Sequence, residues 1–479
     1  MTSTTDTTST AFSSLPLTPA FLANLDSLGY HEMTTIQAQS LPAVLDGRDL
    51  IAQAKTGSGK TAAFGIGILH KLNPAWFAVQ GLVMCPTREL ADQVAGELRR
   101  LARGVGNVKV VTLTGGIPMR PQIASLEYGA HIVVGTPGRI RDHLQRKTLD
   151  LARLRTLVLD EADRMTDMGF YDEIAAIIRE CPERRQTLLF SATYPDDIRV
   201  ATALFLKDPE EVAVETRHVP NQIAQRFYEI GFDGRDEAAA RVLRHYRPRS
   251  AIAFCNTKVR CREVAAYLRE QGFAALALYG EMEQRERDET LVLFANGSCS
   301  VLVATDVAAR GIDVAGLEIV LNVDVSKDPE VHVHRVGRTG RAGETGVAIT
   351  LSAPNEKRFV RLIEDLQGFA AEWHPLADLD DVSVPADELA ALAPMVTLCF
   401  AGGKKDKLRP GDLLGALTKD AGLTMDQVGK INIFEFLSYV ALDRGAAAGA
   451  FQRLNANNPL GPDFGTVKGR NFKMRFIDA

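Results

Sequence analysis

The sequence predicts two α/β domains in tandem, each with a mostly parallel sheet, and a small α+β domain after them. Three observations support this fold class. Short apolar runs alternate with helical patterns between residues 49 and 190, the alternation returns between residues 250 and 351, and the pattern changes to βαββαβ after residue 395. At 479 residues the chain is too long for a single hydrophobic core.

Composition and charge exclude several classes of protein. The chain is 46% hydrophobic and 24% charged, as in ordinary globular proteins, and we expect no membrane partner because no uncharged apolar run reaches about 18 residues. Its six cysteines form no C-x-x-C pair, which predicts reduced thiols, a cytoplasmic location and no zinc site. With a net charge of −5 the protein is not a generally basic nucleic-acid binder, so any such binding must use local patches.

In the first predicted domain, a phosphate-binding loop joins an apolar stretch at residues 49–52 to a helical pattern at 62–66. The backbone N–H groups of such a loop wrap phosphates, Lys60 reaches the outer phosphate oxygens and Thr61 ligates Mg²⁺. Alanine stands where the strict pattern begins with glycine. The loop consists of Ala54, Lys55, Thr56, Gly57, Ser58, Gly59, Lys60 and Thr61.

The strand-like run at residues 156–159 ends in the carboxylates Asp160, Glu161 and Asp163. A carboxylate at the carboxyl end of a buried parallel strand faces the crevice where ligands bind. We therefore expect Asp160 to hold Mg²⁺ and Glu161 to orient or deprotonate an attacking water. Together with the phosphate-binding loop, these residues predict an ATP site.

Further strand-like runs at residues 81–85, 108–113, 132–134 and 187–190 end in turns that suit a phosphodiester backbone. Because the carboxyl ends of parallel strands meet at one edge of a sheet, their arginines, hydroxyls and exposed N–H groups could bind nucleic acid together. The candidates are Pro86, Thr87, Arg88, Gly116, Thr136 and Arg139.

The second predicted domain repeats the α/β alternation without a second phosphate-binding loop, in strand-like runs at residues 251–255, 274–278, 299–304, 317–323 and 347–351. Arg335, Arg338 and Arg341 share a three-residue spacing, which would place them on neighbouring faces of one helical turn. In isolation such a row is most often a solvated basic helix. Downstream of an ATP site it predicts an arginine finger.

These stretches resemble the motifs of the DEAD-box family of ATP-dependent RNA helicases, whose namesake sequence is matched letter for letter by Asp160-Glu161-Ala162-Asp163. The resemblance covers residues 12–350. It implies two RecA-like domains that bind ATP with Mg²⁺, hydrolyse ATP when RNA is bound and separate RNA strands locally. One departure is His332, where the family commonly has an aromatic residue.

The same resemblance implies roles for individual residues. Contacts with adenine and ribose would come from Phe12, Tyr30, Gln37 and Asp313. The arginine fingers would be Arg338 and Arg341. RNA would be held by Thr257, Gln284, Arg287 and Thr305. Hydrolysis would be coupled to domain closure by Asp163, Ser191, Thr193 and His334. Neither domain carries all of these groups, so we expect catalysis to require that the two domains close around ATP while RNA lies across both. ATP and RNA should therefore favour the same closed state.

Residues 395–479 predict an RNA-recognition-motif-like domain, with strand-like runs at 396–400, 431–434, 436–442 and 472–477 and helical patterns at 410–419 and 444–454. The usual base-stacking pattern is absent, and its nearest counterpart, residues 436–440, could be core. A bacterial branch of the family combines such a domain with the helicase core, which implies binding to 23S ribosomal RNA during assembly of the large ribosomal subunit. RNA contact is assigned to basic residues, namely Lys404, Lys405, Lys407, Arg409, Lys468, Arg470 and Lys473.

The predicted organisation is a disordered tail (residues 1–14), two RecA-like helicase domains (15–208 and 218–370), an acidic linker (371–394) and an RNA-binding domain (395–479). The linker carries six carboxylates and no Lys or Arg. Two alternatives stay open, a P-loop motor acting on DNA and a non-enzymatic RNA-binding scaffold. The sequence indicates no protein partner.

Overall fold

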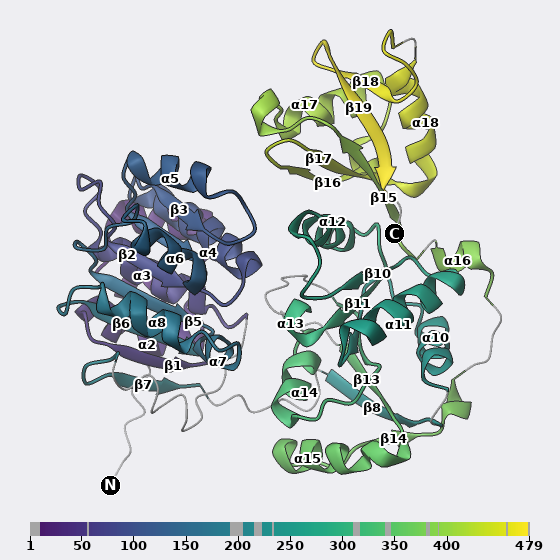
Figure 1. Ribbon diagram of the computed structural model, residues 1–479, viewed down its shortest axis with the longest axis horizontal. Coiled ribbons are helices and arrows are strands. Elements are labelled where there is room, and N and C mark those ends of the chain that lie inside the picture. The colour runs from purple at the N-terminus through teal and green to yellow at the C-terminus, as the bar shows by residue number, and fades with distance from the viewer. Residues whose placement is uncertain are drawn as a thin grey trace. The chain divides into compact units, whose positions relative to one another are not determined.

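The computed structural model describes residues 10–54, 57–191, 205–214, 223–231, 234–309, 317–340, 346–379, 384–390, 392–456 and 458–477. The chain divides into two compact units, Met1–His218 and Val219–Ala479. The first unit holds one α/β domain, and the second holds another α/β domain and the C-terminal domain (Figure 1).

A seven-stranded parallel sheet forms the centre of the first unit, in the order β3-β4-β2-β5-β6-β1-β7. Strands β2, β4, β5 and β6 are buried along their whole length, as expected when helices cover both faces of a parallel sheet. The strands are β1 (Leu50–Gln53), β2 (Gly81–Met84), β3 (Val110–Leu113), β4 (Ile132–Gly135), β5 (Thr156–Asp160), β6 (Gln186–Ser191) and β7 (Glu210–Ala213).

Helices lie on both faces of this sheet (Figure 1). Val158 of β5 packs in the same cluster as Phe64, whereas its neighbours Leu157 and Leu159 pack in another cluster with Ile177. This alternation gives the domain two hydrophobic cores, one on each side of the sheet. The helices are α1 (Pro19–Ser27), α2 (Thr35–Asp46), α3 (Lys60–Lys71), α4 (Arg88–Leu101), α5 (Met119–Glu127), α6 (Pro137–Gln145), α7 (Ala162–Asp167) and α8 (Tyr171–Arg179).

The α/β domain of the second unit repeats this plan with seven parallel strands in the order β10-β11-β9-β12-β13-β8-β14. The strands are β8 (Ile223–Glu229), β9 (Ala251–Cys255), β10 (Ala275–Leu278), β11 (Val301–Thr305), β12 (Ile319–Asn322), β13 (Gly346–Ser352) and β14 (Trp373–His374). The helices are α10 (Arg235–Tyr246), α11 (Lys258–Glu270), α12 (Gln284–Ala295), α13 (Asp306–Ala309), α14 (Pro329–Val336) and α15 (Lys357–Gln367).

Part of the segment predicted as an acidic linker, residues 371–394, packs on this α/β domain. Strand β14 pairs with β8, and a short helix α16 (Ala386–Ala390) follows. Leu379 and Leu389 are 1% exposed and belong to the hydrophobic cluster that contains α10 and α11. Apolar residues placed between the carboxylates therefore hold the described part of the segment against the domain.

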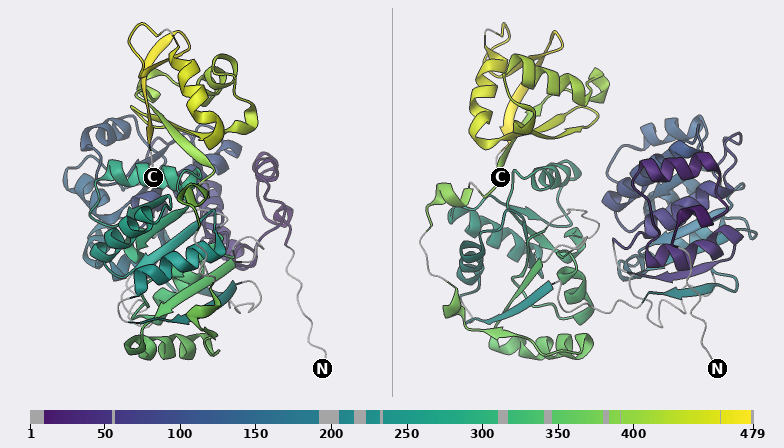
Figure 2. Two further views of the ribbon diagram at one scale, coloured as in Figure 1. Left: turned by 90° about the vertical axis from the view of Figure 1, so that its right-hand side faces the viewer. Right: turned by 180° about the vertical axis from the view of Figure 1, so that it is seen from behind.

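The C-terminal domain has an antiparallel sheet in the order β16-β17-β15-β19-β18, and helices α17 and α18 pack on one face of it (Figure 2). The predicted βαββαβ order is confirmed, with β18 as an additional hairpin strand that the sequence did not reveal. The elements are β15 (Met395–Phe400), α17 (Pro410–Gly415), a π-helix (Ala416–Asp420), β16 (Val428–Ile433), β17 (Ser438–Asp443), α18 (Arg444–Asn455), β18 (Phe464–Val467) and β19 (Arg470–Ile477).

The other face of this sheet contacts the α/β domain of the same unit around α12. Tyr439 Oη donates to Glu289 Oε2 at 3.2 Å, and Arg475 Nη2 lies 3.5 Å from the same carboxylate oxygen. Thr397 Oγ1 bonds to Asn296 Nδ2 at 2.8 Å. Tyr439 and Cys399, in the middle of the sheet, are each 3% exposed.

Candidate nucleotide and RNA sites

The phosphate-binding loop connects β1 to α3, as the sequence predicts. Gly57 and Gly59 have φ angles of +81° and +98°, which L side chains rarely adopt. A Cβ on Gly59 would also meet Gln37 Nε2 at 2.5 Å. Lys60 is 6% exposed, and its Nζ donates to the carbonyl of Ala54 at 2.7 Å. Lys55 and Thr56 lie outside the described residues.

The predicted acidic residues follow β5 directly. Asp160 is its last residue, and Glu161 precedes α7 in the left-handed region at φ +56°. Such a conformation is costly for a residue with a side chain and persists where the surrounding structure holds it. Glu161 Oε2 accepts a hydrogen bond from Arg164 Nη1 at 2.9 Å, and both side chains are 6% exposed.

Ser191, at the end of β6, joins the two halves of this site. Its carbonyl accepts from Ala54 N at 3.0 Å, and its Oγ accepts from Asp163 N at 3.2 Å. The loop, the acidic strand end and Ser191 are therefore adjacent, as the sequence predicts for Asp163 and Ser191. Thr193 lies outside the described residues.

The environment of Asp160 fits a divalent cation. Burial raises the pKa of Asp160 to about 7, while Lys60 acts in the opposite direction. The described residues contain no cluster of three or more metal-ligating His, Cys, Asp or Glu side chains. Mg²⁺ suits such a site, because it is commonly held by one or two protein oxygens together with substrate phosphates. Asp160 and Thr61, the second residue of α3, are the residues that would hold it.

Of the residues predicted to read adenine, Gln37 contacts the phosphate-binding loop, whereas Phe12 and Tyr30 pack against each other. Gln37 is 1% exposed, accepts from Thr34 N at 2.9 Å and donates to Gly59 O at 3.1 Å. Thr34 Oγ1 donates to Ser58 O at 2.8 Å. Phe12 is buried and lies edge-on to Tyr30, with ring centroids 6.2 Å apart.

Two of the predicted RNA-contacting residues, Arg88 and Arg139, pack against the loop that follows β3. A Cβ on Gly116 would lie 1.6 Å from Arg88 Nη1, so the guanidinium packs directly against this glycine, whose φ is +71°. Both terminal nitrogens of Arg139 donate to Ile117 O at 3.1 Å. Thr87 and Thr136 are the residues that immediately precede α4 and α6, after strands β2 and β4.

In the second unit, the predicted RNA contacts follow neighbouring strands. Thr257 caps α11 after β9 by accepting from Arg260 N at 3.3 Å, and Thr305 ends β11. Arg287 on α12 donates to Ala308 O at 2.9 Å, just beyond Thr305. Gln284 begins α12. The structure thus places these side chains along one edge of the second sheet.

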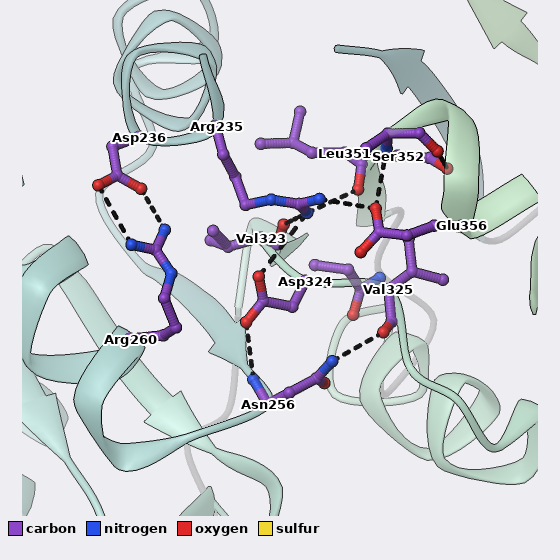
Figure 3. Close-up of polar contacts among 12 residues, drawn as sticks. Arg235, Asp236, Asn256, Arg260, Val323, Asp324, Val325, Leu351, Ser352 and Glu356 are labelled. Carbon is purple, nitrogen blue, oxygen red and sulfur yellow. Dashed lines mark hydrogen bonds and ion pairs between the residues drawn. The ribbon is translucent and has the colours of Figure 1, made fainter. Parts of the chain in front are cut away.

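A polar network around the buried Arg335 adjoins the ends of β9 and β11. Figure 3 shows Arg235 in an ion pair with Glu356 at 2.6 Å and close to Asp324, whose Oδ2 accepts from Asn256 N at 2.9 Å. Arg335 continues the network by donating to Asn256 Oδ1 at 2.8 Å. It also donates to the two oxygens of Asp306 at 2.6 and 2.7 Å.

The prediction that three arginines share one helical turn is wrong. Arg335 is the only one within α14, because Gly337 ends that helix and Arg338 follows it. Both Arg335 and Arg338 are buried, at 2% and 6% exposed. Arg335 lies within α14 and donates to the network, and Arg338 lies beyond the end of the helix. His334 lies on α14 and is half-buried. Arg341 and Asp313 lie outside the described residues.

The seven predicted basic residues of the C-terminal domain are all exposed. Two separate stretches meet where Arg470 Nη2 contacts Asp406 Oδ1 at 3.3 Å and Lys468 Nζ contacts Asp412 at 3.1 Å. The structure therefore brings residues 404–409 next to residues 468–470. Lys473 lies further along β19.

The sequence of this chain was compared with known families. The DEAD/DEAH box helicase family matches residues 34–200, the helicase conserved C-terminal domain matches 234–343, and the DbpA RNA binding domain matches 397–475. The ATP-dependent RNA helicase DbpA of Escherichia coli is 49% identical over 471 residues, covering 98% of this chain and 100% of that protein. The chain belongs to the DEAD-box RNA helicases. It is an ATP-dependent RNA helicase with a C-terminal RNA-binding domain.

Other relatives of this helicase cover its core. The DEAD-box ATP-dependent RNA helicase CshA of Geobacillus kaustophilus is 46% identical over 72% of this chain and 74% of its own length. A solved structure described as S. cerevisiae Dbp5 bound to RNA and ADP BeF3 matches with a TM-score of 0.72 and 29% identity, over 80% of this chain and 100% of that one. These matches confirm the two predicted RecA-like domains.

Several residues of the helicase were not singled out from the sequence. Arg164, Thr34, Asp306 and Asp324 bond to predicted site residues or to Arg335. For Arg164 a signal was present, because Glu161 and Arg164 are three residues apart at the start of a helix. The partners of Arg335 are far away in sequence and could be found only from the fold. Among the described residues, no helix is long and apolar enough to cross a lipid bilayer.

Proposed function

We propose that this helicase acts on 23S ribosomal RNA during assembly of the large ribosomal subunit, with hydrolysis of ATP–Mg²⁺ stimulated by that RNA. The observation that carries the proposal is identity to DbpA over the whole chain, including the match of residues 397–475 to the DbpA RNA binding domain. The exposed basic residues around residues 404–409 and 468–470 supply the charge that RNA binding requires. All six cysteines are buried and free, which fits a reducing cytoplasm.

In the proposed reaction, the phosphate-binding loop and Lys60 hold the phosphates, and Glu161 orients or deprotonates the attacking water. Mg²⁺ held by Asp160 and Thr61 would neutralise phosphate charge. Arg338 and Arg341 would stabilise charge on the transferred phosphoryl group. Groups from both units are needed, so ATP and RNA favour the same closed state and RNA stimulates turnover.

The ATPase proposal is tested with Glu161→Gln, measured with and without RNA. Loss of the water-orienting carboxylate should lower the RNA-stimulated kcat by about 10²- to 10⁴-fold. Glu127→Gln, which changes an exposed carboxylate at the end of α5, is the matched control and should behave as wild type. Equal rates in Glu161→Gln and wild type would contradict the assigned role.

The 23S proposal is tested by comparing fragments of 23S ribosomal RNA with unrelated RNA of equal length and similar base pairing. Combined replacement of Lys404, Lys405, Arg409 and Arg470 by alanine should remove the preference for 23S fragments and spare ATPase activity at saturating RNA. Lys419→Ala changes an exposed lysine of the same domain and serves as the control. A preference that survives the fourfold replacement would overturn this assignment.

A further inference from the structure

An exposed aromatic ring lies at the turn between β16 and β17 of the C-terminal domain. Phe436 is 64% exposed, although both of its apolar neighbours Phe434 and Leu437 pack against buried clusters. The turn is closed by Phe434 N, which donates to Leu437 O at 2.8 Å. The backbone around Phe436 is therefore fixed while its ring faces solvent.

This turn is attached to the basic stretch at residues 404–407. Lys404 N donates to Phe434 O at 2.8 Å, and Lys405 N donates to Glu435 O at 3.0 Å. A Cβ on Gly403 would lie 2.4 Å from Phe434 O, so only glycine allows the two segments to approach so closely. The backbone segments that carry the ring and the lysines are joined before any ligand binds, which lowers the entropic cost of binding.

The charges beside the ring favour a polyanion. Lys404, Lys405 and Lys407 are exposed. Lys405 Nζ lies 3.3 Å from Glu435 Oε1, with both side chains more than half exposed, and such a surface pair is weak enough to be exchanged for a phosphate contact.

The sheet itself offers no comparable surface at its centre. In domains of this fold, aromatic residues in the middle of the sheet usually stack on bases. Here the central positions Cys399 and Tyr439 are each 3% exposed because they pack in a cluster with residues of the α/β domain. Stacking must therefore use an aromatic residue outside the centre, and Phe436 is the one beside the lysines.

We propose that Phe436 is a stacking platform for an unpaired nucleobase, with Lys404 and Lys405 contacting the flanking phosphates. This site rests on the proposed binding of RNA by the C-terminal domain and identifies the part of the RNA that it takes, a base outside a duplex. Aromatic stacking together with cationic side chains is the usual way in which proteins hold single-stranded nucleic acid.

The test uses the full chain without nucleotide and two RNA probes, a hairpin with an unpaired loop carrying 2-aminopurine and a blunt duplex of the same length. Wild type should quench 2-aminopurine fluorescence on binding. Phe436→Ala and Phe436→Leu should abolish the quenching and weaken hairpin binding by about 5- to 100-fold, since stacking on one base contributes that much. Phe436→Tyr, which keeps an aromatic ring, should retain both the quenching and the hairpin affinity of wild type. Binding of the duplex should be the same in wild type and in all three Phe436 variants.

Two controls separate this site from the proposed function. Leu460→Ala removes another exposed apolar side chain of the same domain and should bind both probes as wild type does. Lys404→Ala should weaken the binding of both probes. It should also make the affinity less dependent on salt concentration, by the amount expected for about one lost phosphate contact, whereas Phe436→Ala should leave the salt dependence unchanged.

The outcomes have distinct meanings. Wild-type hairpin affinity in Phe436→Ala with weakened binding in Lys404→Ala would overturn the stacking site and keep RNA binding by this domain. Wild-type affinity in Phe436→Leu would show that the position needs only apolar contact, which also overturns the proposal. If the combined basic replacements leave RNA binding unchanged, the proposed function of the domain fails as well.

Discussion

Arg164 and Glu161 form a buried ion pair, with Arg164 Nη1 2.9 Å from Glu161 Oε2 and both side chains 6% exposed. The residue assigned to orient the attacking water is thus held by a neighbour one helical turn away. Its backbone at φ +56° is held in an unfavourable region by the same short segment between β5 and α7. Arg164 is consequently in direct contact with the proposed ATP site, although it lies outside the sequence motif.

Removing either partner of this pair should destabilise the first unit, because the other charge is left buried without a partner. Arg164→Ala should lower the free energy of unfolding by about 3 kcal/mol. The double variant Arg164→Ala/Glu161→Gln should lose less than the sum of the single variants. Urea unfolding followed by the fluorescence of Trp76 measures this in a Trp373→Phe background, since the chain has two tryptophans, one in each unit. Additive losses would contradict the pairing.

Gly116 and Arg88 should act as one unit in RNA binding. Any side chain at Gly116 must displace the Arg88 guanidinium, since a Cβ there would lie 1.6 Å from Nη1. We expect Gly116→Ala, Arg88→Ala and the double variant to weaken RNA binding to the same extent, by about tenfold for one lost charged hydrogen bond. The concentration of RNA at half-maximal ATPase stimulation measures this effect. Gly96→Ala, at a helical glycine with open space around its Cβ, is the control. A double variant much weaker than either single variant would show independent roles.

Much of the fold could be predicted from the sequence because buried parallel strands are continuous apolar runs. Strand β9 matches its predicted bounds, and β2, β4 and β5 differ by one residue. Strands β7, β8 and β14 were missed for a physical reason. They lie at or next to the edge of their sheets, where exposed residues interrupt the apolar pattern.

The proposed ATP site was predictable in part because its motifs sit at the carboxyl ends of β1, β5 and β6, which are neighbours in the sheet. Asp163 and Ser191 were predicted to be linked and are joined by a hydrogen bond, whereas the bond between Ala54 N and Ser191 O was not predicted. The partners Asp306 and Asn256 of the buried Arg335 were not predicted, since their contacts with it depend on how β9, β11 and α14 come together. The sequence pattern also could not show that Gly337 ends α14 before Arg338.

Arg335 should be required as arginine and not merely as a cation. Its guanidinium spans Asp306, Asn256 and the carbonyl of Asp324, a geometry that an ammonium group cannot reproduce. We expect Arg335→Lys to lower the stability of the second unit by about 3 kcal/mol, because it leaves buried acceptors unsatisfied. Fluorescence of Trp373 in a Trp76→Phe background reports the unfolding. Arg358→Lys, at an exposed arginine of α15, is the control, and an equally small effect in both variants would contradict the network's importance.

His332 should make the second unit sensitive to acid. Burial lowers the pKa of His332 to about 3, and Arg335 acts in the same direction. The unfolded chain binds a proton at this residue near pH 6.5, whereas the folded chain does not, so the free energy of unfolding decreases as the pH falls below 6.5. At pH 5.5 this loss amounts to about 1.4 kcal/mol relative to neutral pH.

Replacing His332 by phenylalanine should remove this part of the acid sensitivity and keep the packing. The imidazole stacks on the ring of Phe227 with the ring centroids 6.0 Å apart, its Nδ1 has no hydrogen-bond partner, and its Nε2 lies 3.2 Å from Gln225 Oε1. A phenylalanine ring therefore keeps the stacking and gives up one hydrogen bond, a loss that is the same at both pH values. Trp373 lies 5.7 Å from Phe227 and reports on this cluster in a Trp76→Phe background. The difference in stability between pH 7.5 and pH 5.5 should be smaller in His332→Phe than in the background protein by about 1.4 kcal/mol. An unchanged difference in His332→Phe would show that His332 is protonated in the folded protein.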